Sequence, residues 1–134
     1  MCTFVEAVKN KHMALKHLNL SVPDVAETKA FFETYFGFQC LEVKGDNIIA
    51  ILKDEDDFIL SISNFHKDQT VQYPADFHLG FVQETPEQVM AIYQNLKANG
   101  IDVGKEPHTY GGRGTMSFYV TAPGNFLIEV LCIS

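Results

Sequence analysis

Three side chains that lie far apart in the sequence could together bind a metal ion: His17, His78 and Glu129. Each falls at a position of a predicted strand that points away from the predicted helices. Two imidazoles and one carboxylate suit Fe(II), Mn(II), Ni(II) or Zn(II) and leave coordination positions for water or substrate. Their separations do not make a local metal motif, and an isolated strand histidine is more often a hydrogen-bonded polar residue. The residues alone leave both interpretations open.

The closing stretch Ser117–Leu131 is predicted to position Glu129. It is typical of a strand, a turn and a second strand, because apolar and polar residues alternate on both sides of Ala122-Pro123-Gly124-Asn125. Proline fixes φ for the turn entry, and glycine and asparagine tolerate positive φ. In this register Glu129 shares a face with Leu127 and Leu131, where a carboxylate is costly unless a charged group meets it.

The first half of the chain has the predicted order β-α-β-β-β. A half-buried strand around Leu18–Val22 leads into a helix that Asp24 caps and Gly37 ends. Three short strands follow, over about 39–43, 48–52 and 57–64.

The second half repeats this order. A strand around 76–81 leads into a helix that Thr85 caps and Gly100 ends. We then expect a strand over Ile101–Val103, a loop over Gly104–Thr115 and the closing hairpin.

The duplication predicts an α+β fold: two βαβββ modules forming a curved mixed sheet with the helices on its convex face. We expect an N-terminal extension over 1–14 and a single domain over 15–134. Within that domain, module one (15–64) and module two (76–134) are joined by a polar linker (65–75). The polar positions of each first strand would line the concave face.

The composition argues against two classes of partner. A net charge of −7 argues against nucleic acid and anionic membranes. There is no apolar run of about 20 residues, as a membrane span would need, and no leader pattern. The scattered cysteines Cys2, Cys40 and Cys132 predict idle thiols in a reducing cytoplasm.

Three stretches of the chain resemble the vicinal oxygen chelate superfamily of glyoxalases, bleomycin-resistance proteins, fosfomycin-resistance enzymes and extradiol dioxygenases. They are, in order, LKHLNLSVPDVAETKAFFETYFGF, DFHLGFVQETPEQVMAIYQNLKANGIDV and SFYVTAPGNFLIEV. The resemblance covers Leu15–Leu131 and implies the duplicated fold. It also places the family's metal ligands on His17, His78 and Glu129.

The resemblance implies further site residues. Enzymes of the glyoxalase I type use a fourth ligand that falls here on Ser61. Because a hydroxyl is a poor ligand for these ions, a three-ligand site is favoured, and Ser61 is expected among the substrate-binding residues. Ser117 and Tyr119 fall where fosfomycin-resistance enzymes place phosphonate-contacting hydroxyls. Tyr119 and Glu129 are the candidates for catalysis.

A glycine-rich loop, Tyr110–Gly114, contains Arg113, a cation close to the closing hairpin. Its backbone N–H groups and the guanidinium could bind an anionic substrate group such as a carboxylate. A lid with a surface arginine fits the same residues. His108, in the same predicted loop, is a candidate for substrate contact, although a surface histidine is the more common case for a loop.

Two functions of different classes follow. The first is a divalent-metal-dependent enzyme, a lyase, isomerase, transferase or dioxygenase, acting on a small oxygen-chelating substrate. The second is a metal-free drug- or toxin-binding protein of the bleomycin-resistance type, for which the negative charge favours a cationic guest. The resemblance also implies a homodimer. Its metal site would lie within one chain, or combine His17 of one chain with His78 and Glu129 of the other.

Overall fold

The structure, a computed structural model, describes residues 13–67, 70–110 and 114–133. Its elements, in chain order, are β1 (His17–Ser21), α2 (Val25–Tyr35), β2 (Gln39–Lys44), β3 (Ile49–Lys53), β4 (Ile59–Ser63), β5 (His78–Gln83), α3 (Pro86–Ala98), β6 (His108–Tyr110), β7 (Thr115–Thr121) and β8 (Leu127–Cys132). The order β-α-β-β-β therefore occurs twice, as predicted.

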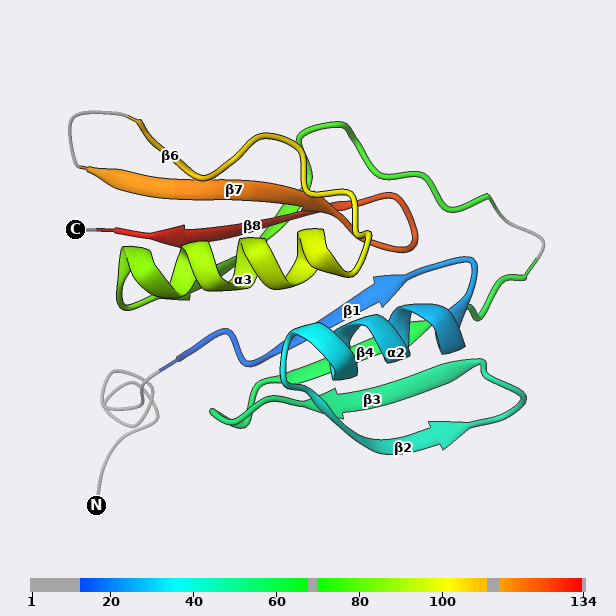
Figure 1. The fold of residues 1–134 in the computed structure, drawn as a ribbon. Coiled ribbons are helices and arrows are strands. Elements are labelled where there is room, and N and C mark those ends of the chain that lie inside the picture. Colours follow the sequence, from blue (N-terminus) through cyan, green and yellow to red (C-terminus); the bar gives the residue numbers. More distant parts are fainter. Residues whose placement is uncertain (1–12, 68–69, 111–113, 134) are drawn as a thin grey trace, which may run out of the picture.

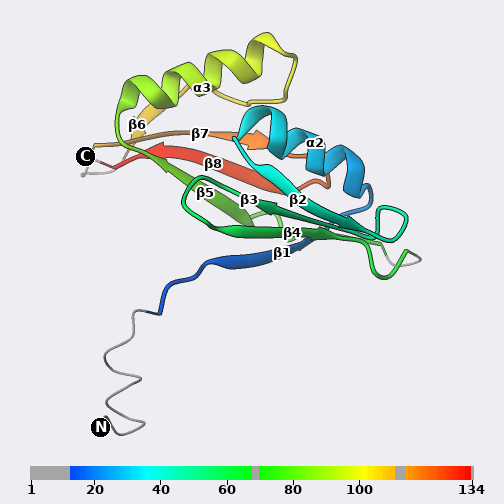
Figure 2. The ribbon, with the colours of Figure 1, turned by 90° about the horizontal axis from the view of Figure 1, so that it is seen from below.

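The strands form two four-stranded sheets of identical topology, β1-β4-β3-β2 and β5-β8-β7-β6. In each sheet the first strand pairs in parallel with the last, and the other pairs are antiparallel. Both helices lie on the same side of the molecule (Figures 1 and 2). The predicted fold class is confirmed, with the strands divided between two sheets. Neither helix of the described residues is long and apolar enough to cross a membrane.

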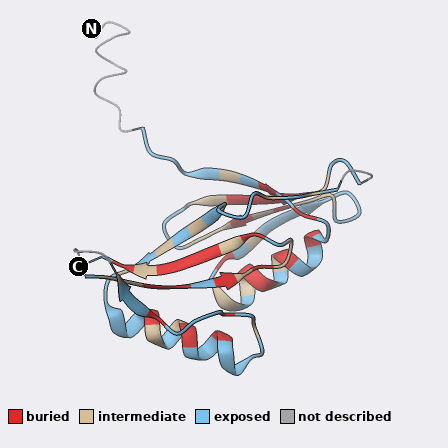
Figure 3. Cartoon of the chain, turned by 90° about the horizontal axis from the view of Figure 1, so that it is seen from above, coloured by how far each residue is buried: buried red, intermediate tan, exposed pale blue. Residues whose placement is uncertain are grey.

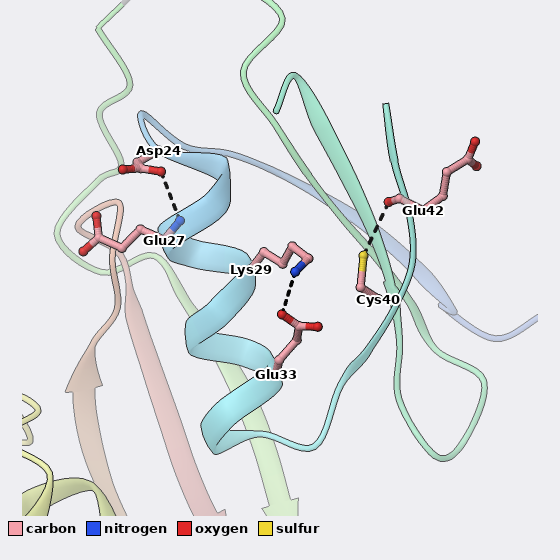
Figure 4. A network of polar contacts seen from close by, with 6 residues as sticks. All are labelled: Asp24, Glu27, Lys29, Glu33, Cys40 and Glu42. Carbon is pink, nitrogen blue, oxygen red and sulfur yellow. Dashed lines mark hydrogen bonds and ion pairs between the residues drawn. The ribbon is translucent and has the colours of Figure 1, made fainter. Parts of the chain in front are cut away.

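Local hydrogen bonds start both helices at the predicted residues. Asp24 accepts from the backbone N–H of Glu27 at 3.0 Å (Figure 4). At the start of α3, Thr85 accepts from the N–H of Gln88, whose side chain accepts in return from the N–H of Thr85, so both halves of a capping box are present. These side chains satisfy amide groups that lack partners within the helix.

The predicted strand over Ile101–Val103 is wrong, and the third strand of the second half lies later in the chain. Ile101–Val103 makes one hydrogen bond to β7, from the N–H of Thr121 to the carbonyl of Asp102, at 3.0 Å. The strand that pairs with β7 is β6, inside the segment predicted as a loop. A three-residue strand leaves too short an alternation for the sequence to reveal it.

The two halves share one hydrophobic core. The aromatic residues of α2 and of its C-cap, predicted as core, also reach across to the second half. Phe32 stacks on Phe126 with ring centroids 6.4 Å apart, and the ring centroids of Phe36 and Phe81 are 4.7 Å apart. Buried residues gather on the strands and on the helix faces turned toward them (Figure 3). Neither half can therefore bury its apolar face alone.

The linker residue Tyr73 ties the halves together. Its hydroxyl donates to the carbonyl of Ser21 at 2.8 Å and accepts from the Ser21 N–H at 3.0 Å, while its ring stacks on Phe77, 4.7 Å away. Burial raises the pKa of the Tyr73 phenol, and the hydrogen bond to Ser21 lowers it by less. The beginning of β5 is thereby fixed beside the end of β1.

As a result β1 and β5, the inner edges of the two sheets, run in opposite directions. In Figure 1 the arrowheads of β1 and β8 point opposite ways, and β5 is parallel to β8. A groove of about 550 Å³ lies between these edges; Leu18 of β1, Leu60 of β4 and every residue of β5 line it.

Candidate functional site

The register of β5, β7 and β8 gathers four predicted site residues on one face of the second sheet. Glu129 is the Cα partner of Gly80 on one side and of Tyr119 on the other. His78 and Ser117 lie two positions from these partners, so their side chains leave the sheet on the same side. We call this surface the Glu129 face. Helix α3 covers the opposite face, where Tyr93 contacts Phe118 edge to face at 5.3 Å.

His78 and Glu129 form the central pair of this face. The His78 Nε2 lies 3.6 Å from Glu129 Oε1, and the two side chains are 40% and 9% exposed. The other ring nitrogen, Nδ1, lies 2.8 Å from the carbonyl oxygen of Asp76. That contact requires a proton on Nδ1, so in the neutral imidazole the Nε2 lone pair faces the carboxylate. The Tyr119 ring stands edge-on to the imidazole, 5.7 Å away.

This geometry suits a divalent metal ion. A lone pair and a carboxylate oxygen repel each other unless a proton or a cation lies between them. Two ligands at about 2.1 Å from one tetrahedral ion lie about 3.4 Å apart, close to the separation of 3.6 Å found here. The Nδ1 contact to a backbone carbonyl is the usual outer support of a metal-binding histidine. His78 and Glu129 therefore fit as two ligands of one ion.

His17 occupies the matching place in the first half but has a neutral partner. Its Nε2 lies 3.3 Å from the Ser61 hydroxyl oxygen, and that hydroxyl donates to the side-chain oxygen of Asn19 at 2.8 Å. Because the hydroxyl proton is directed at Asn19, the Ser61 oxygen can accept a hydrogen bond from the imidazole N–H. Ser61 is thus buried beside His17, and sequence reasoning missed Asn19 as its support.

The described part of one chain does not assemble the predicted triad. No group of three or more His, Cys, Asp or Glu side chains able to hold a metal occurs among the described residues. The opposite directions of β1 and β5 explain this result. His17 and His78 each begin their strand, and Tyr73 binds Ser21, at the far end of β1 from His17. The structure therefore brings His78 to Glu129 and keeps His17 apart.

The other predicted site residues have different positions. The Ser117 hydroxyl oxygen is buried and is the one buried side-chain polar atom of the described residues with no hydrogen-bond partner. Tyr119 is 39% exposed on the same face. Arg113 lies outside the described residues. His108, predicted in a loop, is in β6 directly opposite Ser117. Had this segment been predicted as a strand, His108 would have been placed beside Ser117.

Comparisons with known proteins place this duplicated α+β chain in a family. The model of the Glyoxalase/Bleomycin resistance protein/Dioxygenase superfamily matches residues 14–130. The chain belongs to this superfamily, as its three stretches predicted. No curated protein matches the chain.

Solved structures support the same fold. A protein from Bacillus cereus described as a "possible Glyoxalase" is 45% identical, with a TM-score of 0.77 over 90% of this chain and 100% of that one. The fosfomycin resistance protein FosX from Listeria monocytogenes is 20% identical, with a TM-score of 0.74, 92% of this chain and 96% of that one covered. A lactoylglutathione lyase from Agrobacterium tumefaciens is 18% identical, with a TM-score of 0.72 over 89% of this chain and 92% of that one. The last two likenesses show the fold alone.

Proposed function

We propose that the protein is a divalent-metal-dependent enzyme that acts on a small oxygen-chelating substrate, and that a homodimer completes its metal site. The observation that carries the proposal is the His78–Glu129 pair, with Nε2 turned toward the carboxylate and Nδ1 held by a backbone carbonyl. His78 and Glu129 of one copy and His17 of a second would hold the ion. His17 and His78 are both exposed on edge strands, so each is accessible to another chain.

The bound ion would supply positive charge to stabilise an oxyanion or enolate of the substrate. The side chains around it would orient the substrate. The Tyr119 hydroxyl and the Ser117 hydroxyl lie on the Glu129 face and can donate hydrogen bonds to substrate oxygens. Ser61 would keep the His17 imidazole in place through its hydrogen bond. Arg113 stays a predicted contact for a substrate carboxylate.

The groove between β1 and β5 supports a second candidate function, a metal-free binding protein of the bleomycin-resistance type. Its volume of about 550 Å³ suits a small ligand. Apolar side chains make up much of its lining, which also includes Asp54 and Asp56. Together with the net charge of −7, these aspartates favour a cationic guest.

Metal analysis of untagged protein purified without chelators separates the two functions. The enzyme proposal expects a stoichiometric divalent ion. It also expects metal affinity to fall at least roughly tenfold in His78→Ala with the fold retained. His66→Ala, an exposed linker histidine, is the matched control. A protein without metal, whose His78→Ala variant binds a cationic ligand like the wild type, would favour the binding function.

Mixing two inactive variants tests the shared site directly. His17→Ala and Glu129→Gln each remove one ligand from a different half. If two copies share the site, a mixed dimer contains one complete site of its two. An equal mixture whose subunits reassort at random contains about half mixed dimers, so metal binding returns to about a quarter of the wild-type stoichiometry. If each site lies within one chain, mixing restores nothing. Analytical ultracentrifugation of the wild type checks that the dimer forms.

A further inference from the structure

The Glu129 face continues beyond the candidate metal ligands to a second polar pair. In the antiparallel ladder of β6 and β7, His108 is the Cα partner of Ser117. Ser117 lies two residues before Tyr119, which is the partner of Glu129. From strand spacings, Ser117 lies about 8 Å from Glu129 and His108 about 12 Å away. The pair is therefore separate from His78 and Glu129 but within reach of the same small ligand.

Ser117 is the first indication that this place receives a ligand. It is 1% exposed, and its hydroxyl oxygen has no hydrogen-bond partner among the described residues. A buried hydroxyl without a partner costs about 1–3 kcal/mol. A ligand oxygen that accepts its proton would relieve this cost.

His108 is oriented by the same local contact as His78. Its Nδ1 lies 3.1 Å from the carbonyl oxygen of Glu106, two residues earlier, as His78 Nδ1 lies 2.8 Å from that of Asp76. Each histidine begins its strand. With Nδ1 held in this way, protonation of the ring adds an N–H donor at Nε2. The exposed imidazole and the neighbouring hydroxyl can then donate to one oxyanion.

We propose that His108 and Ser117 bind a carboxylate at the far end of a substrate whose near end is held at His78 and Glu129. The substrate would be an unbranched acid of about six carbons, with an oxygen-chelating group at one end and a carboxylate at the other. The near-end assignment rests on the proposed function, whereas the carboxylate site stands on the register and on the Ser117 hydroxyl.

Two acids of equal length test the site: 2-oxoadipate, which has the far carboxylate, and 2-oxohexanoate, which has a methyl group there. Calorimetry on the full-length protein, with its metal content measured first, should show that 2-oxoadipate binds roughly tenfold more tightly, the worth of one charge-assisted hydrogen bond. His108→Gln and Ser117→Ala should each remove most of this difference, and His108→Gln should leave the affinity for 2-oxohexanoate unchanged. His66→Gln should have no effect.

The thermal stability of the Ser117→Ala variant distinguishes a ligand-binding role of Ser117 from a purely structural one. Removal of an unpartnered buried hydroxyl should leave the thermal midpoint unchanged or raise it, while 2-oxoadipate binds more weakly. Equal affinity of the two acids for the wild type, a preference that survives in both variants, or no binding of either acid would overturn the proposal. If the protein contains no metal, adipate replaces 2-oxoadipate and hexanoate replaces 2-oxohexanoate. The metal analysis therefore tests the proposed metal site, and the affinities of the two acids test the proposed carboxylate site independently.

Discussion

Each half of the molecule places a histidine at the start of the first strand of its own sheet. The halves differ in the side chain that this imidazole contacts. In the first half, His17 Nε2 lies 3.3 Å from the Ser61 hydroxyl. In the second, His78 Nε2 lies 3.6 Å from the Glu129 carboxylate. Ser61 and Glu129 occupy equivalent positions in β4 and β8. The shared topology therefore fixes the geometry, and one residue decides whether the imidazole meets a hydroxyl or a carboxylate.

The neighbouring strand position increases this difference. Asn19, the strand partner of Ser61, accepts a hydrogen bond from the Ser61 hydroxyl. The residue equivalent to Asn19 in the second half is Gly80, the strand partner of Glu129. Among the described residues, a Cβ at Gly80 would meet only Leu131, at 3.6 Å, so their packing does not require glycine here. The first half thus links its histidine to a serine and an asparagine by hydrogen bonds, whereas the second places its histidine beside a carboxylate.

The largest expected effect comes from breaking the core that both halves share. Phe32→Ala should lower the free energy of unfolding by about 3–5 kcal/mol, because Phe32 is fully buried and stacks on Phe126 of the other half. Denaturant unfolding followed by circular dichroism would measure it. Phe65→Ala, at a position 61% exposed, is the control and should change stability by less than about 0.5 kcal/mol. Native-like amide protection retained in the second half alone would contradict a common core.

The next effect tests the residue that distinguishes the halves. Glu129→Ser gives the second half the serine of the first, and metal affinity should fall roughly 100-fold, about 2.7 kcal/mol, because the carboxylate ligand is lost. Equilibrium dialysis with Co²⁺ or Zn²⁺ measures the affinity. Ser61→Ala, the corresponding position of the first half, should lower it by only about tenfold, since Ser61 supports His17 through a hydrogen bond and does not bind the ion itself. Equal losses in both variants would mean that the halves contribute alike.

A smaller effect concerns the contact that joins the halves. The pKa of Tyr73 is raised by burial, so its contribution to stability is complete below the unfolded pKa of about 10 and is lost as the pH rises through the folded value. The free energy of unfolding of the wild type should therefore decline at alkaline pH. Tyr73→Phe should lower stability by roughly 1–2 kcal/mol near neutral pH and decline less steeply above pH 10 or so. Tyr35→Phe is the control, and an identical alkaline profile in the Tyr73 variant would contradict this account.

The smallest effect compares the two helix starts. Asp24→Ala and Thr85→Ala should each lower stability by about 1 kcal/mol, because each removes the side chain that accepts an unpaired helix N–H. Asp24 also places a negative charge at the positive end of its helix, an interaction that salt screens. In thermal melts, added NaCl should therefore reduce the Asp24→Ala penalty and leave that of Thr85→Ala unchanged. The same salt response in both variants would mean that the charge of Asp24 contributes nothing.

Local patterns in the sequence predicted most of the fold. Caps at Asp24 and Thr85, and the turn before Glu129, depend on a few adjacent residues, and the structure confirms all three. The pairing of His78 with Glu129 followed from alternation and from the repeat. The short strand containing His108 was missed, because its place depends on pairing with β7 rather than on its own sequence.

The relative placement of the halves could not be predicted in this way. It is set by contacts between distant aromatic side chains, such as Phe36 with Phe81, and by the hydrogen bonds of Tyr73 to Ser21. Hydrophobic spacing predicts that Phe36 packs inward but not which half it meets. The separation of His17 from His78 follows from these long-range contacts alone.

The Tyr73 hydroxyl has a consequence for self-association. Main-chain hydrogen bonds join Lys16 and Val22 to β4. Because this pairing alternates along the strand, the N–H and carbonyl groups of Ser21 point instead toward the unpaired edge of β1. Such open groups invite strands of other molecules to add, which is a common route to aggregation. Tyr73 in the linker occupies both groups of Ser21 and so shortens the edge with which a strand of another molecule could pair. The residue that joins the halves should therefore also reduce self-association of the protein at high concentration.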